Sequence, residues 1–204
     1  MRGAPTPPDG QRARLVLVAG PSGSGKSRLA HASDCLAFRL DDFYFDADHP
    51  GLPRAHGIVD WDDAATWDAA GAVAALAELV GTGATRVPTY SIAESRRVGV
   101  RPVELGDRPL VVAEGIFAVE LLAPAREAGL DVAPVYLDRN RTLVALLRLQ
   151  RDLRQHRKPP LVLLRRGFAL WRAQPGLKRR ALAAGFTPLT MRRALAGLAA
   201  APAG

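Results

Sequence analysis

Short apolar runs lie at 15–19, 109–113 and 133–137, and a less uniform run lies at 35–40. Runs of this length that are apolar at nearly every position are typical of parallel strands covered on both faces. Apolar residues also recur at helical spacing, which predicts helices at 26–32, from 62 or 63 to 80, and at 118–128, 141–157 and 161–173. Strands that alternate with helices predict an α/β fold of three layers, with a parallel sheet between two layers of helices.

Segments rich in turn-forming residues separate these elements. Residues 46–60 are rich in Pro, Gly and Asp and are expected to be a loop, whereas 84–108 contains extended pieces at 86–90 and 101–105 that predict a small hairpin or flap. The stretch 184–189 is expected to add a short edge strand. Residues 1–13 are polar and Pro-rich and predict a flexible tail. We therefore expect a single domain at 14–204, which at this size can bury a substantial core.

Composition narrows the class of protein. Hydrophobic residues make up 48% of the 204 residues, as in globular proteins. No apolar run reaches the length of a membrane span, and the first residues lack the apolar stretch of a secretory signal. Cys35 is the only cysteine, which excludes an internal disulfide and argues against a cysteine-based metal cluster. Together these observations predict a cytoplasmic location and no membrane partner.

The net charge of +8 comes from one segment of the chain. Residues 139–180 contain 13 Arg and Lys side chains and a single acid, Asp152, whereas residues 1–138 carry 13 basic and 19 acidic side chains. A phosphate-binding lid needs such a segment, and an RNA-binding stripe could also produce it. Arginine is well suited to binding phosphate, because its planar guanidinium group can bind two oxygens at once and keeps its proton.

Directly after the first apolar run, a Gly-rich motif fits the pattern G-x-x-x-x-G-K-[ST] at every fixed position. It consists of Gly20, Pro21, Ser22, Gly23, Ser24, Gly25, Lys26 and Ser27. In a strand–loop–helix context, the glycines let backbone N–H groups surround phosphate oxygens, and the following helix adds its positive N-terminal end. Lys26 supplies charge for the β- and γ-phosphates, and the Ser27 hydroxyl can bind Mg²⁺. The motif predicts a site for a nucleoside triphosphate, with ATP and Mg²⁺ as the cofactors.

Acidic residues follow two of the other predicted strands. Asp41 and Asp42 come at the end of 35–40 and are followed by Phe43 and Tyr44, and Glu114 follows 109–113. Since the carboxyl ends of parallel strands meet at one edge of a sheet, we expect these carboxylates beside the phosphate loop. There Asp41 can orient a hydroxyl acceptor and take its proton, and Glu114 has the position of a Mg²⁺-binding acid. An aromatic side chain beside a carboxylate, such as Tyr44, can form a wall for a planar ligand.

Taken in order over about 15–175, these motifs resemble the uridine kinase family of phosphate-loop kinases, whose relatives include phosphoribulokinase and bacterial pantothenate kinase. The matching segments beyond the phosphate loop are 40–44 (family D-S-F-Y), 59–62 (F-D-H-P), 88–90 (P-x-Y), 113–116 (F-E-G-I), and Arg148 with Arg151 and Asp152 (R-x-x-R-D). The resemblance implies a single P-loop kinase domain with an Arg-rich lid at about 141–175.

The resemblance also implies roles for individual residues. Catalytic roles would fall to Asp41, Lys26, Arg148 and Arg151, and metal binding to Ser27, Asp41 and Glu114. Substrate contacts would come from Tyr44, Asp60, Tyr90, Arg97 and Lys158, with Asp60 on the ribose hydroxyls. Helical spacing beside the lid break favours Arg148, Arg151, Arg154, Arg157 and Lys158 as the basic residues that reach ligands, with Arg157 assigned to ATP. The remaining basic residues of this segment, Arg139 and Arg141 among them, are expected on solvated surface.

Two departures from the family pattern concern the acceptor. The family continues D-F-x-x-H-S-R after P-x-Y, whereas in 91–97 of this chain Ser95 stands in place of the base-recognising His and Arg97 retains the arginine. Beyond the lid, Lys158 stands near a family arginine, but Pro159 and Pro160 and an apolar run replace the segment with a base-reading Gln. The phosphoryl-transfer residues therefore match the family better than the base-recognising residues do.

The function expected is ATP-dependent phosphorylation of a nucleoside 5′-hydroxyl, with uridine or cytidine converted to the monophosphate. Two alternatives stay open. One is a kinase of the same superfamily that acts on pantothenate, a sugar phosphate or a modified nucleoside, and the other is a nucleotide-dependent RNA-binding module. The expected partner is a small-molecule acceptor rather than a nucleic acid, and the resemblance is compatible with a homo-oligomer.

Overall fold

Five parallel strands form one sheet in the computed structural model, which describes residues 11–31, 34–55, 57–154 and 174–199. The strands are β1 (Arg14–Ala19), β2 (Leu36–Arg39), β7 (Leu110–Glu114), β8 (Val132–Leu137) and β9 (Thr187–Leu189). Their order across the sheet is β2-β7-β1-β8-β9, and every neighbouring pair is parallel. The α/β fold expected from the sequence is confirmed, including the short edge strand near 184–189.

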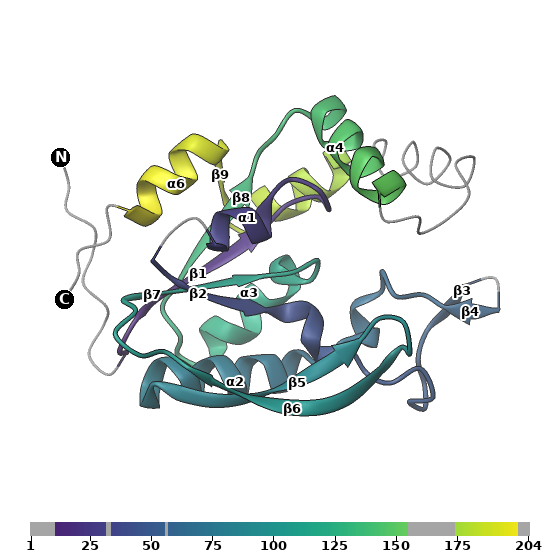
Figure 1. Cartoon of the computed structure of the whole chain (residues 1–204), viewed down its shortest axis with the longest axis horizontal. Coiled ribbons are helices and arrows are strands. Elements are labelled where there is room, and N and C mark those ends of the chain that lie inside the picture. The colour runs from purple at the N-terminus through teal and green to yellow at the C-terminus, as the bar shows by residue number, and fades with distance from the viewer. Residues whose placement is uncertain (1–10, 32–33, 56, 155–173, 200–204) are drawn as a thin grey trace.

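Helices cover both faces of this sheet (Figure 1). One face carries α1 (Lys26–His31) and α6 (Met191–Ala199), and the other carries α2 (Ala69–Thr82) and α3 (Ala118–Glu127). The central strand β1 contributes to both cores: Val16 and Val18 pack on the α1–α6 side, and Leu15 and Leu17 pack on the α2–α3 side. This alternation explains why β1 is apolar along its whole length.

The expected helix start at residue 62 or 63 is wrong, because two local caps divide that stretch. The Asp63 carboxylate accepts from the backbone N–H of Ala65 at 2.8 Å and caps a short 3₁₀ turn, η2 (Ala64–Thr66). Trp67 is then extended and buried, and α2 begins only after Asp68, whose Oδ1 accepts from the N–H of Gly71 at 2.8 Å. Asp63 and Asp68 are both favourable N-cap residues, so the sequence alone does not show which of them precedes the long helix.

Two hairpins lie outside the main sheet. The expected loop at 46–60 contains the short strands β3 (Arg54–Ala55) and β4 (Ile58–Val59). The expected flap at 84–108 is confirmed as a hairpin of β5 (Ala84–Ser91) and β6 (Arg96–Glu104), which is longer than the predicted extended pieces and has a register shift between Thr89 and Tyr90. This hairpin runs along α2 and reaches the end of the sheet where the site lies (Figure 1).

The C-terminal part contributes to both faces of the sheet: Ala181 and Phe186 join the α2–α3 core, and Ala194 and Leu198 of α6 join the α1–α6 core. Helix α4 (Arg141–Arg154) begins as predicted, residues 174–183 are helical, and the predicted helix at 161–173 lies outside the described residues. Helix α6 was not predicted, although Thr190 precedes it with a hydroxyl 3.4 Å from the N–H of Arg193, a helix-start signal. Over the described ranges, no helix combines the length and apolar character needed to cross a membrane.

Candidate active site

Three strand ends meet at one edge of the sheet and bring the predicted site residues together. In the parallel registers, Val18 of β1 and Arg39 of β2 both pair with Glu114 of β7. The phosphate loop leaves β1 at this point, and a 3₁₀ turn, η1 (Leu40–Phe43), leaves β2. The chain therefore delivers the loop, Asp41 and Glu114 to one place, as the strand-end argument requires.

The phosphate loop is folded tightly against the end of β8. Gly25 has φ of +96°, a left-handed conformation that favours glycine, and a Cβ there would lie 2.8 Å from the flexible end of the Met191 side chain and 3.4 Å from an Arg139 nitrogen. Arg139 donates to the Ser24 carbonyl at 3.1 Å. Arg139 was expected on solvated surface, and this contact corrects that expectation. Its position directly after the last buried strand was the signal that it would lie near the loop.

Lys26 is buried within the loop, with 7% of its surface exposed. Its Nζ donates to the Gly20 carbonyl at 2.9 Å and to the Pro21 carbonyl at 3.4 Å. These bonds hold the ammonium group inside the curve of the loop. A charge held in this way needs little rearrangement to meet phosphate oxygens.

Ser27, Glu114 and Asp41 form a candidate magnesium site. The Ser27 hydroxyl donates to Glu114 Oε1 at 2.8 Å. Asp41 Oδ1 accepts from the N–H of Ile116 at 3.3 Å, and burial, reinforced by the charge of Glu114, raises the pKa of Asp41 above its ordinary value. One hydroxyl and two carboxylates are oxygen ligands of the kind that Mg²⁺ uses together with water and phosphate, so these residues fit the metal. Among the described residues there is no group of three or more His, Cys, Asp or Glu side chains with metal-binding geometry.

Gly115 lets the β7 end approach Asp41 closely. A Cβ at this position would lie 2.7 Å from the Leu40 Cβ and 2.8 Å from Asp41 Oδ1. Any larger side chain would therefore displace the carboxylate or the turn that carries it. The sequence placed Gly115 beside a candidate metal ligand but did not show this contact.

Four aromatic rings form a wall beside Asp41, and Tyr44 lies at its centre. Its ring centroid lies 5.5 Å from those of Trp61 and Tyr90 and 5.7 Å from that of Phe117. The Tyr44 hydroxyl donates to the Trp61 carbonyl at 3.0 Å, and burial, with the charge of Asp41 next, raises the pKa of Tyr44. The Tyr90 hydroxyl is buried and has no hydrogen-bond partner within the part of the chain that the structure describes. We refer to Tyr44, Trp61, Tyr90 and Phe117 as the aromatic wall.

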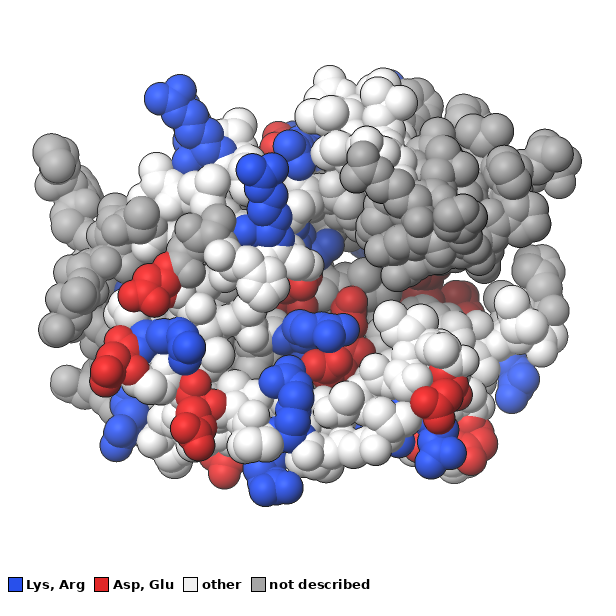
Figure 2. Space-filling model, viewed as in Figure 1, with Lys and Arg blue, Asp and Glu red and all other residues white. Residues whose placement is uncertain are grey.

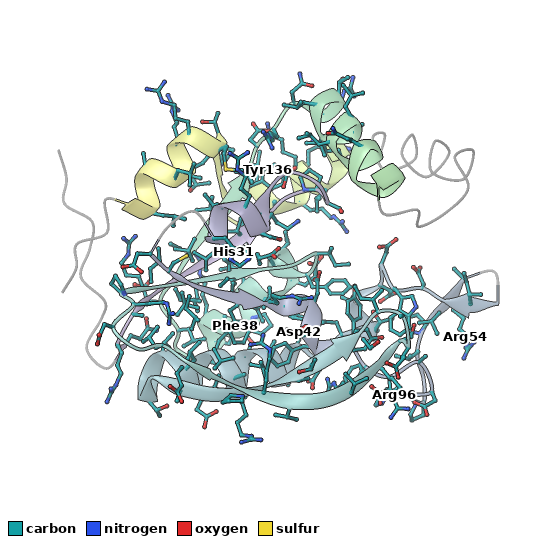
Figure 3. The ribbon with its side chains drawn as sticks, in the orientation of Figure 1. His31, Phe38, Asp42, Arg54, Arg96 and Tyr136 are labelled. Carbon is teal, nitrogen blue, oxygen red and sulfur yellow. The ribbon has the colours of Figure 1, made fainter. Side chains whose placement is uncertain are left out.

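Two acidic residues, Asp42 and Asp60, lie next in sequence to residues of this region. Asp60 follows β4, and its Oδ1 accepts from the N–H of Asp62 at 3.3 Å. Asp42 is buried and pairs with Arg101 of β6 at 3.1 Å, which fastens η1 to the hairpin. Figure 3 places Asp42 near the middle of the molecule and Arg54 on the peripheral β3–β4 hairpin. Figure 2 shows a hollow on the right of the view, below the grey atoms, with acidic side chains inside it.

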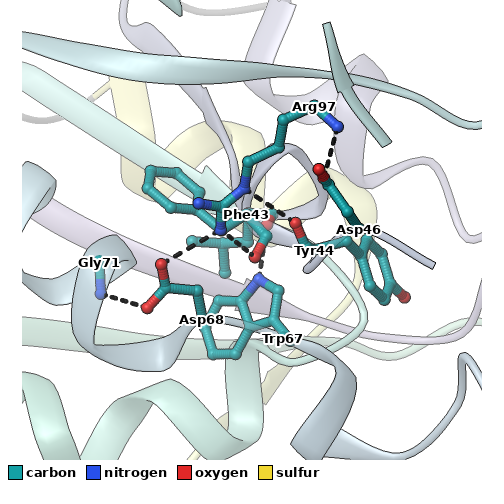
Figure 4. A network of polar contacts seen from close by, with 8 residues as sticks. Phe43, Tyr44, Asp46, Trp67, Asp68, Gly71 and Arg97 are labelled. Carbon is teal, nitrogen blue, oxygen red and sulfur yellow. Dashed lines mark hydrogen bonds and ion pairs between the residues drawn. The ribbon is translucent and has the colours of Figure 1, made fainter. Parts of the chain in front are cut away.

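Arg97 lies on β6 opposite Tyr90, and its contacts run to the segment 43–46 and to Asp68 (Figure 4). The structure thus brings Tyr44, Tyr90 and Arg97 together, and Asp60 directly precedes Trp61 of the aromatic wall. Of the lid residues, Arg148 and Arg151 belong to α4, but their side chains lie outside what the structure describes. Arg157 and Lys158 lie outside the described residues altogether. The ligand roles of these residues stay predictions.

A cavity of about 300 Å³ opens next to Arg139, on the β8 side of the phosphate loop. Its lining comes from the end of β8, the start of α4 and the helical residues 174–183: Asp138, Arg139, Arg141, Gln174, Pro175 and Lys178. Lys178 donates to the Asp138 carboxylate at 2.7 Å, and Gln174 donates to the Arg139 carbonyl at 3.3 Å. The cavity and the aromatic wall thus flank the phosphate loop, and different elements form each of them.

No family model matches this chain, and no curated protein matches it in sequence. In structure, it is similar to a protein from Silicibacter sp. TM1040 assigned as a fructose transport system kinase, with a TM-score of 0.57, 18% identity, and coverage of 90% of this chain and 91% of that chain. It is also similar to the YGR205w protein, with a TM-score of 0.52, 15% identity, and coverage of 90% and 88%. A protein described as a possible uridine kinase from Bacillus stearothermophilus is 24% identical over 65% of this chain and 74% of its own, with a TM-score of 0.44. At these identities the similarity establishes the architecture, and the chain has the α/β phosphate-loop fold that the first two proteins share.

Proposed function

We propose that this protein is an ATP-dependent kinase that phosphorylates a hydroxyl group of a small molecule. The observation that carries this proposal is the meeting of Lys26, the hydrogen-bonded pair of Ser27 and Glu114, and the partly buried Asp41 at one sheet edge. A triphosphate-binding loop and a base for a hydroxyl acceptor are the two parts that phosphoryl transfer needs. A non-catalytic binding module has no use for the second part.

Each residue would have a definite task in the transfer. Lys26 holds positive charge against the β- and γ-phosphates, and Ser27 and Glu114 hold Mg²⁺, which supplies further charge stabilisation when bound. Asp41 orients the acceptor hydroxyl and takes its proton while the new oxygen–phosphorus bond forms and the bond between the γ-phosphorus and the departing ADP breaks. The raised pKa of Asp41 favours this task, because a base with a higher pKa binds the proton more strongly.

For the acceptor, we propose a nucleoside, with uridine and cytidine as the first candidates. The aromatic wall lies beside Asp41 and could stack on a base, and Asp60, which directly precedes Trp61 of the wall, is our candidate for the ribose hydroxyls. The cavity beside Arg139 would take the base of the donor nucleotide. Aromatic rings also pack against the apolar faces of sugars, so a neutral sugar belongs in the same test.

The test is ADP release from Mg-ATP in the presence of uridine, cytidine, other nucleosides, a neutral sugar, pantothenate, ribulose 5-phosphate or buffer alone. Stimulation by uridine or cytidine supports the full proposal, and stimulation by another compound keeps the transfer reaction and changes the acceptor. Lys26→Ala is expected to abolish stimulated release. If no compound stimulates ADP release while RNA binds with strong salt dependence, the kinase proposal is wrong and the binding-module alternative is favoured.

A further inference from the structure

Arg97 donates hydrogen bonds to several groups within the protein. Its Nε donates to the Tyr44 carbonyl at 3.0 Å, and one guanidinium nitrogen donates to the Phe43 carbonyl at 3.2 Å and to Asp68 Oδ2 at 3.1 Å (Figure 4). Its backbone N–H donates to Asp46 Oδ1 at 2.7 Å. One residue of the hairpin therefore contacts both ends and the middle of the segment 43–46.

Asp68, which pairs with Arg97, is itself held in place by further hydrogen bonds. Asp68 caps α2 through its other oxygen, which accepts from the N–H of Gly71, and its own N–H donates to the Phe43 carbonyl at 3.0 Å. A Cβ on Gly71 would lie 2.5 Å from Asp68 Oδ2, so the glycine makes room for the carboxylate. The Arg97 side chain is about one third exposed and that of Asp68 one quarter, so the pair is partly shielded from solvent.

The segment 43–46 carries the central ring of the aromatic wall and begins two residues after Asp41. Its other backbone bond to the α2 side runs from the N–H of Phe45 to the carbonyl of Thr66 at 2.9 Å. The guanidinium carbon of Arg97 also lies 5.7 Å from the centre of the Phe45 ring, within the range of a cation–π contact. A residue that binds two consecutive carbonyls and stacks on the next ring restricts the conformation of the whole segment.

We propose that Arg97 is a positioning residue, which holds 43–46 between the β5–β6 hairpin and the start of α2 and so fixes the Tyr44 ring relative to Asp41. It acts through Tyr44 and does not bind the acceptor directly. The inference rests on the proposed function for its effect on turnover, but the fixing of the segment can be measured without turnover.

The experiment compares Arg97→Gln with Arg96→Gln, a matched control at the neighbouring exposed position on β6. Two readouts are taken on the full chain: hydrogen–deuterium exchange at 43–47, and kcat and KM for ATP and for each accepted compound. We expect Arg97→Gln to speed exchange at 43–47 and to lower kcat/KM by about 10- to 100-fold, by a similar factor for every acceptor, with KM for ATP unchanged. Arg96→Gln should change neither readout.

Two further variants keep the test decisive if Arg97→Gln folds poorly. Arg97→Lys keeps the charge for Asp68 but loses the planar group that reaches both carbonyls, so part of the loss should be recovered. Asp68→Asn keeps the cap of α2 and weakens the ion pair, and it should act in the same direction with a smaller effect. Unchanged exchange in these variants overturns the inference, as does a loss confined to one acceptor, which would make Arg97 a direct ligand. If the wild-type protein phosphorylates nothing, the proposed function fails, and exchange at 43–47 still decides whether Arg97 holds the segment.

Discussion

Adding one methyl group at Gly115 should impair catalysis by displacing Asp41, although Gly115 itself takes no part in the proposed reaction. The new Cβ would lie 2.8 Å from Asp41 Oδ1, where ordinary contacts begin at about 3.4 Å, so the carboxylate must move by about 0.6 Å or more. Rotation of the Asp41 side chain alone cannot relieve this crowding, because the new Cβ would also lie 2.7 Å from the Leu40 Cβ, which is attached to the backbone of the same turn. We therefore expect the whole turn to shift.

The magnitude follows from the size of this displacement. A misplacement of about 1 Å can cost about 100-fold in rate, so Gly115→Ala should lower kcat by about 10- to 100-fold. Crowding of this kind also costs about 1–3 kcal/mol of folding stability. Both effects are measured on one preparation, by ADP release with the best acceptor and by chemical denaturation.

Gly81→Ala is the matched control, because nothing lies within 4 Å of a Cβ at this helical position. This variant should keep full activity and gain about 0.5–1 kcal/mol of stability, since alanine favours a helix. If Gly115→Ala retains activity within about twofold of wild type, the reasoning that its contact positions the base is refuted.

Three further predictions concern ionisation and the aromatic wall. Asp41→Asn should lower kcat by about 10²- to 10⁴-fold. Because the pKa of Asp41 is raised in the folded state, ionisation of this carboxyl lowers the stability of the fold as the pH rises above the ordinary range of an aspartate. The Asp41→Asn variant should therefore raise the melting temperature more at pH 7 than at pH 4. An equal gain at both pH values would contradict this. Tyr44→Phe removes the bond to the Trp61 carbonyl and should cost about 1 kcal/mol in chemical denaturation. Tyr90→Phe removes a buried hydroxyl that has no partner among the described residues and should be close to neutral; a loss of about 1 kcal/mol or more would reveal an overlooked partner.

The parts of the fold that could be predicted are those set by local patterns. The apolar run of β1 and the glycine spacing after it specify a buried strand and a phosphate loop whatever surrounds them, and Asp41 and Glu114 then follow from the rule for parallel strand ends. The start of α2 could not be fixed in this way, because Asp63 and Asp68 are both good caps and only the packing of Trp67 between them decides. Burial of that ring is a tertiary effect that no local pattern reveals.

The same limit applies to the candidate site. Arg97 could be aligned with a family arginine, but its partners are 29 to 54 positions away in the sequence, and only the folded hairpin brings them together. Arg139 looked like one more charge in a basic segment, whereas its contact with the Ser24 carbonyl depends on β8 lying beside β1. Contacts of this type depend on register and topology, which residue types alone do not specify.

The two cores on opposite faces of the sheet have a consequence for how substitutions on either face would affect the candidate site. Leu29 of α1, the helix that follows the phosphate loop, belongs to the α1–α6 core, whereas Phe43 of η1 and Val87 of the hairpin belong to the α2–α3 core. Substitutions buried in separate cores that share no neighbours tend to act independently. We therefore expect substitutions at Phe43 and Val87 to affect the proposed acceptor side more than the proposed nucleotide site.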